Sequence, residues 1–212
     1  SNLVLSGVTA DADCVKLTPE EIADGWILLF DGHTTKGWSN SNLKLDQDLI
    51  EDGALTPYKR GAYYLMTDRV FADFVLSVDF KTSDKCNSGI FLRADPKRGM
   101  KLGNDTAWYA FEVAIDEAQE SGHHATGALY DLVPVKKNLS KPVGEWNRAR
   151  ITCDRGLVRV EISGQVVSET VLDQWHVGGK RPDGTSTKFN YPMKPRARSG
   201  FIGLQDHGQP VW

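Results

Sequence analysis

Acidic side chains alternate with apolar ones in a short stretch near the middle of the chain. Every second position holds an aromatic or branched apolar residue, namely Tyr109, Phe111, Val113 and Ile115. The positions between them hold small or acidic residues, namely Ala110, Glu112, Ala114 and Asp116. Because strand side chains alternate between faces, the pattern predicts a strand with one apolar face and one carboxylate face. Carboxylates serve as general bases or bind ligands, and the alanines are expected to leave room for a ligand there.

Two other segments carry groups that could complete such a site. Arg93 ends the apolar run Ile90-Phe91-Leu92, and its fixed positive charge can hold an anion or orient hydroxyl groups. His207 lies in Gly203-Leu204-Gln205-Asp206-His207-Gly208, and histidine can take up or release protons near neutral pH. Both groups have a structural alternative. Arg93 can be a surface charge, and Asp206-His207-Gly208 can be a turn in which Asp206 caps its own backbone.

The spacing of Glu112 and Asp116 argues against an ordinary glycosidase pair. Four residues of ideal strand span about 13 Å at ~3.3 Å per residue. Glycosidase carboxyl groups lie roughly 5 to 9.5 Å apart. Many glucanases also place a third acid between the two, where this chain has Ala114. The spacing and the missing third acid therefore disfavour a two-carboxylate glycosidase.

Composition narrows the classes of protein to which the chain can belong. The 212 residues have a formal net charge of −3 and no basic run, which disfavours nucleic-acid binding. No apolar run approaches the eighteen or so residues of a membrane span. Six tryptophans are compatible with core packing or with stacking against sugars. The three cysteines contain no Cys-x-x-Cys pair, Cys153 fits a buried strand, and whether Cys14 or Cys86 forms a disulfide is open.

The elements that must position these residues are almost entirely strands. Residues 1–17 are expected to be a lead-in, and Thr18-Pro19-Glu20-Glu21 predicts a short capped helix that ends at Gly25. Apolar runs bounded by turn residues predict strands at 26–30, 48–50, 54–57, 62–67, 74–82, 89–94, 108–115, 127–130, 147–154, 157–163, 165–172 and 200–205. Residues 173–199 are rich in glycine and proline and predict a long loop, which is usually functional or poorly ordered. We expect one all-β domain over 18–212, an antiparallel β-sandwich with a short N-terminal helix.

The chain resembles the 3-keto-disaccharide hydrolase domain family, a former domain of unknown function. The matching motifs run in the family's order from about residue 26 onward: Leu29-Phe30-Asp31-Gly32, Gly37-Trp38, Asn87-Ser88-Gly89-Ile90-Phe91-Leu92-Arg93, Phe111-Glu112-Val113, Thr126-Gly127-Ala128-Leu129-Tyr130, Gly144-Glu145-Trp146-Asn147 and Gly203-Leu204-Gln205-Asp206-His207-Gly208. The resemblance implies a concanavalin A-like jelly roll and export to the periplasm or outside the cell. The family usually has one more strand after the last motif, where this sequence ends at Val211-Trp212.

The resemblance also implies a chemistry. A ketone at C3 of a sugar acidifies the proton at C2, so a base can remove that proton and the group at C1 can leave by elimination. Hydration then gives net hydrolysis. Glu112 or His207 would be the base, and Arg93 would hold the enolate. The side chains expected to bind substrate are Asp116, Asn87, Gln205, Tyr130 and Asp206.

Some questions stay open at the level of sequence. Asp116, Glu117 and His207 can also bind a divalent cation, although no spacing motif requires a metal or another cofactor. A non-catalytic carbohydrate-binding module, or a lectin-like domain whose polar face binds a protein, would fit the same sandwich. The sugar, the linkage and the oligomeric state are not specified by these residues.

Overall fold

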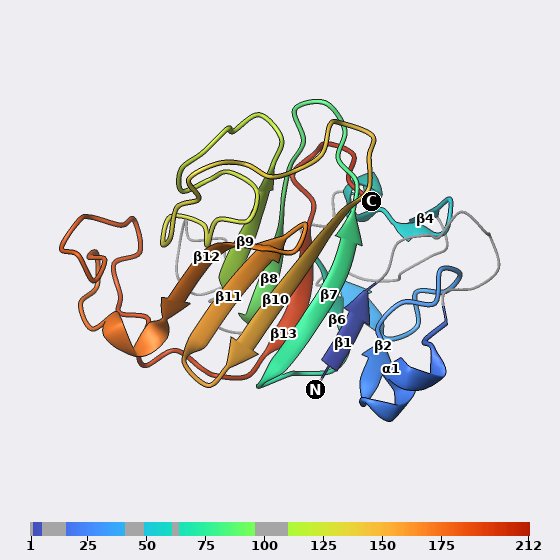
Figure 1. Ribbon diagram of the computed structural model, residues 1–212, viewed down its shortest axis with the longest axis horizontal. Coiled ribbons are helices and arrows are strands. Elements are labelled where there is room, and N and C mark those ends of the chain that lie inside the picture. Colours follow the sequence, from blue (N-terminus) through green and yellow to red (C-terminus); the bar gives the residue numbers. More distant parts are fainter. Residues whose placement is uncertain (1, 6–15, 41–48, 61–63, 96–109) are drawn as a thin grey trace.

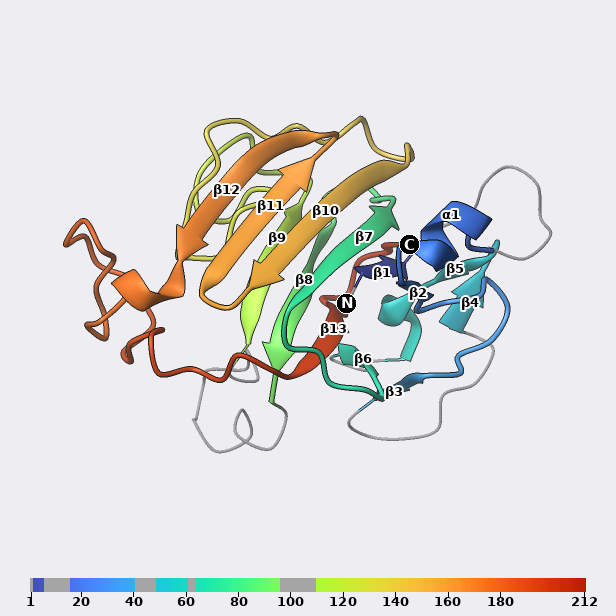
Figure 2. The ribbon, with the colours of Figure 1, turned by 60° about the horizontal axis from the view of Figure 1, so that its bottom comes forward.

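Two β-sheets pack face to face in the computed structural model, which describes residues 2–5, 16–40, 49–60, 64–95 and 110–212 (Figure 1). The six-stranded sheet has the order β12 (Gln165–Val171), β11 (Leu157–Ile162), β10 (Asn147–Asp154), β7 (Phe74–Phe80), β1 (Asn2–Leu5) and β2 (Trp26–Leu28). The five-stranded sheet has the order β3 (Trp38–Asn40), β6 (Tyr64–Thr67), β13 (Phe201–Gln205), β8 (Asn87–Ala94) and β9 (Phe111–Asp116). Figure 2 shows the first sheet lying in front of the second.

Short elements complete the chain. The hairpin of β4 (Ile50–Glu51) and β5 (Ala54–Leu55) forms a separate two-stranded sheet. Helical turns occur at α1 (Pro19–Ala23), η2 (Pro57–Arg60) and η3 (Leu172–Gln174). No helix among the described residues is both long and apolar enough to cross a membrane. The fold is therefore an all-β sandwich with one short N-terminal helix, as predicted.

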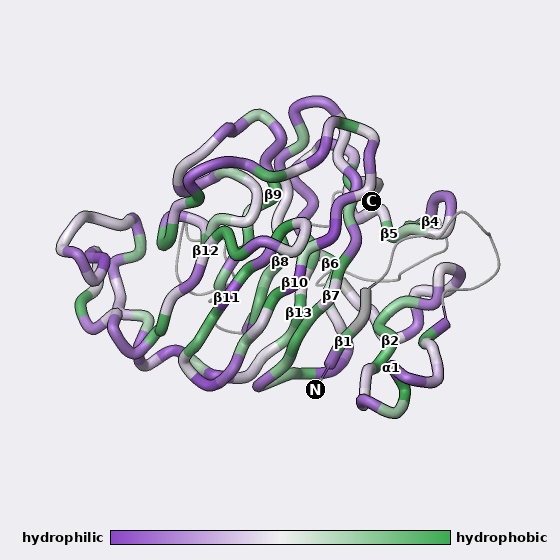
Figure 3. The backbone as a smooth tube through the Cα atoms, viewed as in Figure 1, coloured by the Kyte–Doolittle hydropathy of each residue, from purple (hydrophilic) through white to green (hydrophobic). Residues whose placement is uncertain are grey.

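The core lies between the two sheets and is formed by alternate residues of each strand. Leu76 of β7 and Ile151 of β10 meet Ile90 of β8 and Val113 of β9 in one buried cluster. Figure 3 shows hydrophobic segments alternating with hydrophilic ones along the strands, whereas the connecting loops are mostly in the hydrophilic colour. Burial of apolar side chains along both inner faces is what holds the sheets together.

Local sequence signals predict several elements correctly. The side chain of Thr18 accepts a hydrogen bond from the Glu21 N–H, and Glu21 returns one to the Thr18 N–H, so the predicted capping box is present. Strands β10, β11 and β12 form the predicted antiparallel meander. Cys153 is buried in β10, as expected, and both Cys153 and Cys86 are free thiols. Cys14 lies outside the described residues.

The structure corrects two expectations about elements. Asn2–Leu5, expected in a lead-in, forms β1 and pairs in parallel with both β7 and β2. The physical reason is that Leu3 is fully buried in the sandwich core. Residues 127–130, expected to be a strand, form turns beside β9 with a single bridge between Leu129 and Val113.

Candidate active site

The alternation predicted for the central strand is present in β9. Phe111, Val113 and Ile115 face the core, so Glu112 and Asp116 lie on the opposite side of the sheet. Tyr109 lies outside the described residues. We call this side of β8, β9 and β13 the outer face. Its register places Asn87 opposite Asp116 and Phe91 opposite Glu112.

Gly89 makes room for the Glu112 side chain. A Cβ atom added to Gly89 would lie 2.7 Å from Oε1 and 2.8 Å from Cγ of Glu112. Gly89 pairs with Ala114, two residues along β9 from Glu112, so the Glu112 side chain leans along the strand toward Asp116. Any side chain at residue 89 would displace the carboxylate. The glycine of the Asn87-Ser88-Gly89 segment therefore shapes the floor of the site.

The Glu112 carboxyl group has a pKa close to neutral pH. Loss of solvation by burial raises its pKa from 4.5 to about 7, and the positive charge of Lys188 partly opposes this rise. Such a group exchanges protons readily at neutral pH, which is what a general base or acid requires.

The alanine beside Glu112 does not provide the open floor expected from the sequence. Ala114 is buried against Ala125, Ala128 and Val135 of the loop that follows β9. Backbone hydrogen bonds between Ala114 and this loop hold the loop against the strand. The space at the site comes from Gly89 instead.

Asp116 and Asn87 form the second polar pair of the outer face. The Asn87 Nδ2 group donates to Asp116 Oδ2 at 3.4 Å, and the Ala118 N–H donates to Asp116 Oδ1 at 3.0 Å. Burial raises the pKa of Asp116, although the Ala118 N–H and the nearby His124 and His207 lower it in part. The structure thus brings together two residues that the sequence predicts in the substrate site.

The end of β13 contributes the remaining predicted residues. Gln205 is half-buried, and its Oε1 atom is buried without a hydrogen-bond partner among the described residues. Asp206 accepts a hydrogen bond from the Gly208 N–H at 2.9 Å, which is the structural alternative that the sequence left open. His207 is exposed, and it is close enough to both Asp116 and Asp206 that its charge lowers the pKa of each carboxyl group. His207 therefore lies at the Asp116 end of the outer face.

The structure places Arg93 away from the outer face, which corrects its expected role. Leu92 and Arg93 together oppose Ile202, because β8 carries one more residue than β13 between the pairs Phe91–Gly203 and Ala94–Phe201. This β-bulge, with a φ of 54° at Arg93, takes its side chain off the outer face.

The partners of Arg93 are structural. Its fully buried guanidinium donates to the Ala72 and Arg155 carbonyls at 3.0 Å each and to Asp73 at 3.1 Å. These groups flank the six-stranded sheet, before β7 and after β10. Arg93 therefore links the two sheets through these hydrogen bonds, and its side chain lies away from Glu112 and His207.

Sequence reasoning missed Lys188, which the long loop brings to the site. Its Nζ atom lies 4.1 Å from the centroid of the Tyr130 ring, and its charge acts on Glu112. The Tyr130 ring also stacks on His124 at 4.6 Å, so the predicted Tyr130 joins this group. In the sequence, Lys188 lies within a segment rich in glycine and proline, and no motif or periodicity there distinguishes it.

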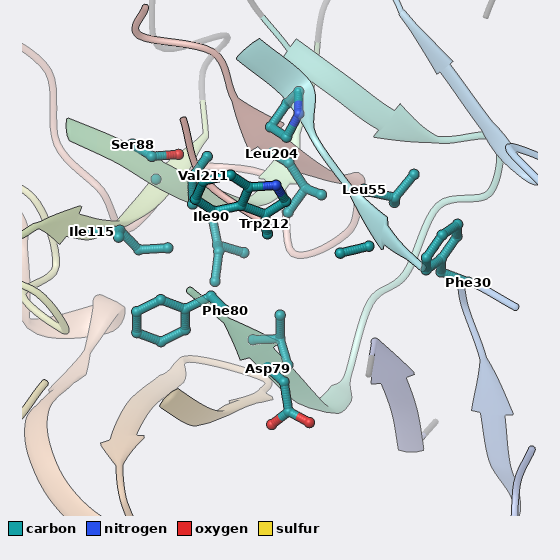
Figure 4. Close-up of a pocket in the computed structure, with 14 residues that line it drawn as sticks. Phe30, Leu55, Asp79, Phe80, Ser88, Ile90, Ile115, Leu204, Val211 and Trp212 are labelled. Carbon is teal, nitrogen blue, oxygen red and sulfur yellow. The ribbon is translucent and has the colours of Figure 1, made fainter. Parts of the chain in front are cut away.

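A cavity between the sheets is a separate feature (Figure 4). Apolar side chains such as Phe80, Ile90, Ile115 and Leu204 line it, and its volume is about 40 Å³. That volume has room for about one water molecule, far below the roughly 300 Å³ or more of a typical ligand site. The cavity is therefore a packing gap in the core.

Some side chains of the outer face are of types that can bind metal ions. Within the part of the chain that the structure describes, no three His, Cys, Asp or Glu side chains gather closely enough to hold an ion. A divalent cation at Asp116, Glu117 and His207 stays a prediction.

The fold and site together define an all-β sandwich with a titratable carboxylate on one outer sheet face. The chain belongs to the family of 3-keto-alpha-glucoside-1,2-lyase-like domains, whose model matches residues 25–212. The resemblance predicted from the motifs is thereby confirmed.

Relatives of known sequence or structure agree with this membership. The chain is 30% identical to a 3-keto-disaccharide hydrolase of Bacteroides thetaiotaomicron, over 96% of this chain and 80% of that protein. A proposed glycosyl hydrolase of Parabacteroides distasonis is 27% identical with a TM-score of 0.59, covering 70% of this chain and 77% of its own. A second one from the same organism has a TM-score of 0.72 at 21% identity over 93% and 94% of the two chains, and supports the fold alone.

Proposed function

We propose that this chain cleaves 3-keto-glycosides by removing the C2 proton of the keto sugar, with Glu112 as the base. The observation that carries the proposal is the Glu112 carboxylate, which lies over Gly89 with a pKa of about 7. Family membership supplies the class of substrate. A carboxylate of ordinary pKa would be a much weaker base for a carbon acid.

The reaction proceeds in three steps, which are proton removal, elimination and hydration. Glu112 takes the proton from C2, and the electron pair of the C–H bond moves into an enolate with its charge on the C3 oxygen. The C1–O bond then breaks, a double bond forms between C1 and C2, and the leaving oxygen takes a proton, for which we assign His207. Water subsequently adds its oxygen to C1 and a proton to C2, which gives the free keto sugar.

The polar groups around Glu112 support sugar binding. Gln205 follows Leu204, which pairs with Ile90, so it lies beside Gly89 on the same face and offers its amide group to a sugar hydroxyl. Asn87 and Asp116 offer further donors and acceptors farther along the same face.

The rival functions are less well supported. A two-carboxylate glycosidase would need Asp116 as the second acid, but this carboxylate already accepts hydrogen bonds from Ala118 and Asn87. A non-catalytic lectin would have no use for a buried carboxylate with a raised pKa, whose burial destabilises the fold.

The test compares a 3-keto-disaccharide with the same disaccharide before oxidation. We expect turnover of the keto form only, and a loss of kcat of about 10²- to 10⁴-fold in Glu112→Gln. Glu145→Gln is the matched control, because Glu145 is exposed and away from the outer face. Turnover of the unoxidised sugar, or full activity of Glu112→Gln, would contradict the proposal, and binding without turnover would favour the lectin.

A further inference from the structure

An enolate needs a positive charge beside its oxygen, and the structure removes Arg93 from that role. The C3 oxygen is attached to the carbon next to C2, so the cation must lie close to the base. Lys188 is the charge that acts on Glu112, and its ammonium group makes no ion pair within 4 Å among the described residues. Its side chain is exposed at the surface of the site and available to a ligand.

We propose that Lys188 is a catalytic residue that stabilises the C3 oxyanion, and that Asp131 is the positioning residue that places it. The inference rests on the proposed function for the identity of the oxyanion. The juxtaposition of Lys188, Glu112 and Tyr130 and the hydrogen bonds to Asp131 are independent of that function.

Asp131 holds both residues that share the peptide bond between Thr187 and Lys188. Its Oδ2 atom accepts the Lys188 N–H at 2.7 Å and the Thr187 hydroxyl at 2.8 Å. Its Oδ1 atom accepts from Arg181 at 3.1 Å, and Arg181 also donates to the Asp131 carbonyl at 2.7 Å. One carboxylate therefore fixes the loop at the residue that carries the ammonium group.

Asp131 is itself held in place beside β9. Asp131 follows Tyr130 directly, and the Tyr130 N–H donates to the Glu112 carbonyl at 2.9 Å. Glu112 is thus linked to Tyr130 by a hydrogen bond, Tyr130 precedes Asp131 in the chain, and Asp131 is hydrogen-bonded to Lys188. Burial alone would raise the pKa of Asp131, but the hydrogen bonds from Lys188 and Thr187 and the charge of Arg181 lower it, so Asp131 stays ionised at neutral pH.

Asp183, an aspartate within the 173–199 loop itself, offers a matched control. Within the described part of the chain, Asp183 accepts side-chain hydrogen bonds from Thr185 alone, through its N–H at 2.9 Å and its hydroxyl at 2.6 Å. Both aspartates stabilise loop turns, but only Asp131 contacts Lys188. Asn is the suitable replacement at each position, and at Asp131 it also tolerates the left-handed φ of 54°.

The first test measures kcat and KM on a 3-keto-glycoside. We expect Lys188→Met to lower kcat by about 10²- to 10³-fold, the range for loss of one oxyanion donor, and Lys188→Arg to recover part of the loss. Asp131→Asn should lower kcat about tenfold or more with little change in KM, and Thr187→Val should do so more weakly. Asp183→Asn should match the wild type, and the double variant Lys188→Met/Asp131→Asn should be no slower than Lys188→Met alone.

The second test does not need turnover. It follows the Glu112 carboxyl group by ¹³C NMR titration in each variant. Losing or displacing the Lys188 charge should raise the pKa of Glu112 in Lys188→Met and in Asp131→Asn, but not in Asp183→Asn. If Asp131 acted only through its own negative charge, Asp131→Asn would lower that pKa instead, and the inference would be wrong.

The two tests separate failure of the inference from failure of the proposed function. If the wild type does not turn over keto-glycosides, the proposed function fails, and with it the catalytic role of Lys188. The NMR titration then still decides whether Asp131 positions Lys188. If the wild type is active and Lys188→Met retains full kcat, the inference alone is overturned.

Discussion

At the scale of single residues, Glu112 occupies a position that is unfavourable for a carboxylate. It lies against the bare backbone of Gly89 and is largely buried, and the nearby Lys188 charge compensates only in part. A buried carboxylate lowers the stability of a fold unless its neighbours stabilise the ionised form. The proposed chemistry explains why a side chain with this effect on stability occupies the site.

Replacing Glu112 should therefore make the protein more stable as well as inactive. The folded-state pKa of about 7 lies above the ordinary 4.5, so ionisation favours the unfolded chain as the pH rises between these values. Glu112→Gln should be more stable than the wild type at pH 8 by on the order of 3 kcal/mol, at 1.36 kcal/mol per pKa unit. The gain should vanish below about pH 4.5.

Urea unfolding of the wild type, Glu112→Gln and the control Glu145→Gln at pH 4.5, 6 and 8 measures this difference. A stability difference that does not change with pH would show that Glu112 is not the buried titrating group.

At the scale of elements, a bulge and a loop decide which cation reaches the site. The bulge in β8 directs Arg93 to the turns beside the six-stranded sheet. The 173–199 loop is held by buried Trp175, Phe189 and Met193, and the Arg196 guanidinium donates to the Ala110 carbonyl at 2.7 Å just before β9. The loop is thereby anchored well enough to position Lys188.

The bulge predicts how Arg93 behaves on substitution. Arg93→Met would leave the buried acceptors on Ala72 and Arg155 without their donor, so we expect a loss of roughly 3–5 kcal/mol in the free energy of unfolding. Arg159→Met is the control, because the side chains of the Arg159–Glu169 ion pair are 41% and 43% exposed, and such a pair is worth at most about 1 kcal/mol.

Urea unfolding and kcat per folded molecule provide the two readouts. Arg93→Met should lose stability and keep its kcat when folded. Normal stability with a selective loss of kcat would return Arg93 to the catalytic role that the sequence suggested.

At the scale of the whole molecule, the sandwich was predictable because much of its signal is local. The Thr18 capping box, the turns between β10, β11 and β12, and the two faces of β9 each follow from a few neighbouring residues. Strand β1 was missed because its pairing with β7 depends on residues far away in the sequence.

The candidate site was predictable only in part, for similar reasons. Glu112, Asn87 and Asp116 share a face by strand alternation, which the sequence shows directly. The extra residue in β8 leaves no mark in that alternation, so Arg93 was assigned to the wrong side. Lys188 comes from a loop without periodicity, and its place depends on hydrogen bonds to Asp131, which lies 57 residues earlier.

The most direct test of the central claim follows the C2 hydrogen of a 3-keto-disaccharide by NMR during cleavage in D₂O. Elimination followed by hydration predicts that the released 3-keto sugar carries solvent deuterium at C2 in every enzymatic turnover. Samples without enzyme and with Glu112→Gln measure the spontaneous exchange. A product that keeps its original C2 hydrogen, together with no isotope effect on cleavage of a substrate deuterated at C2, would show direct hydrolysis and would contradict the role assigned to Glu112.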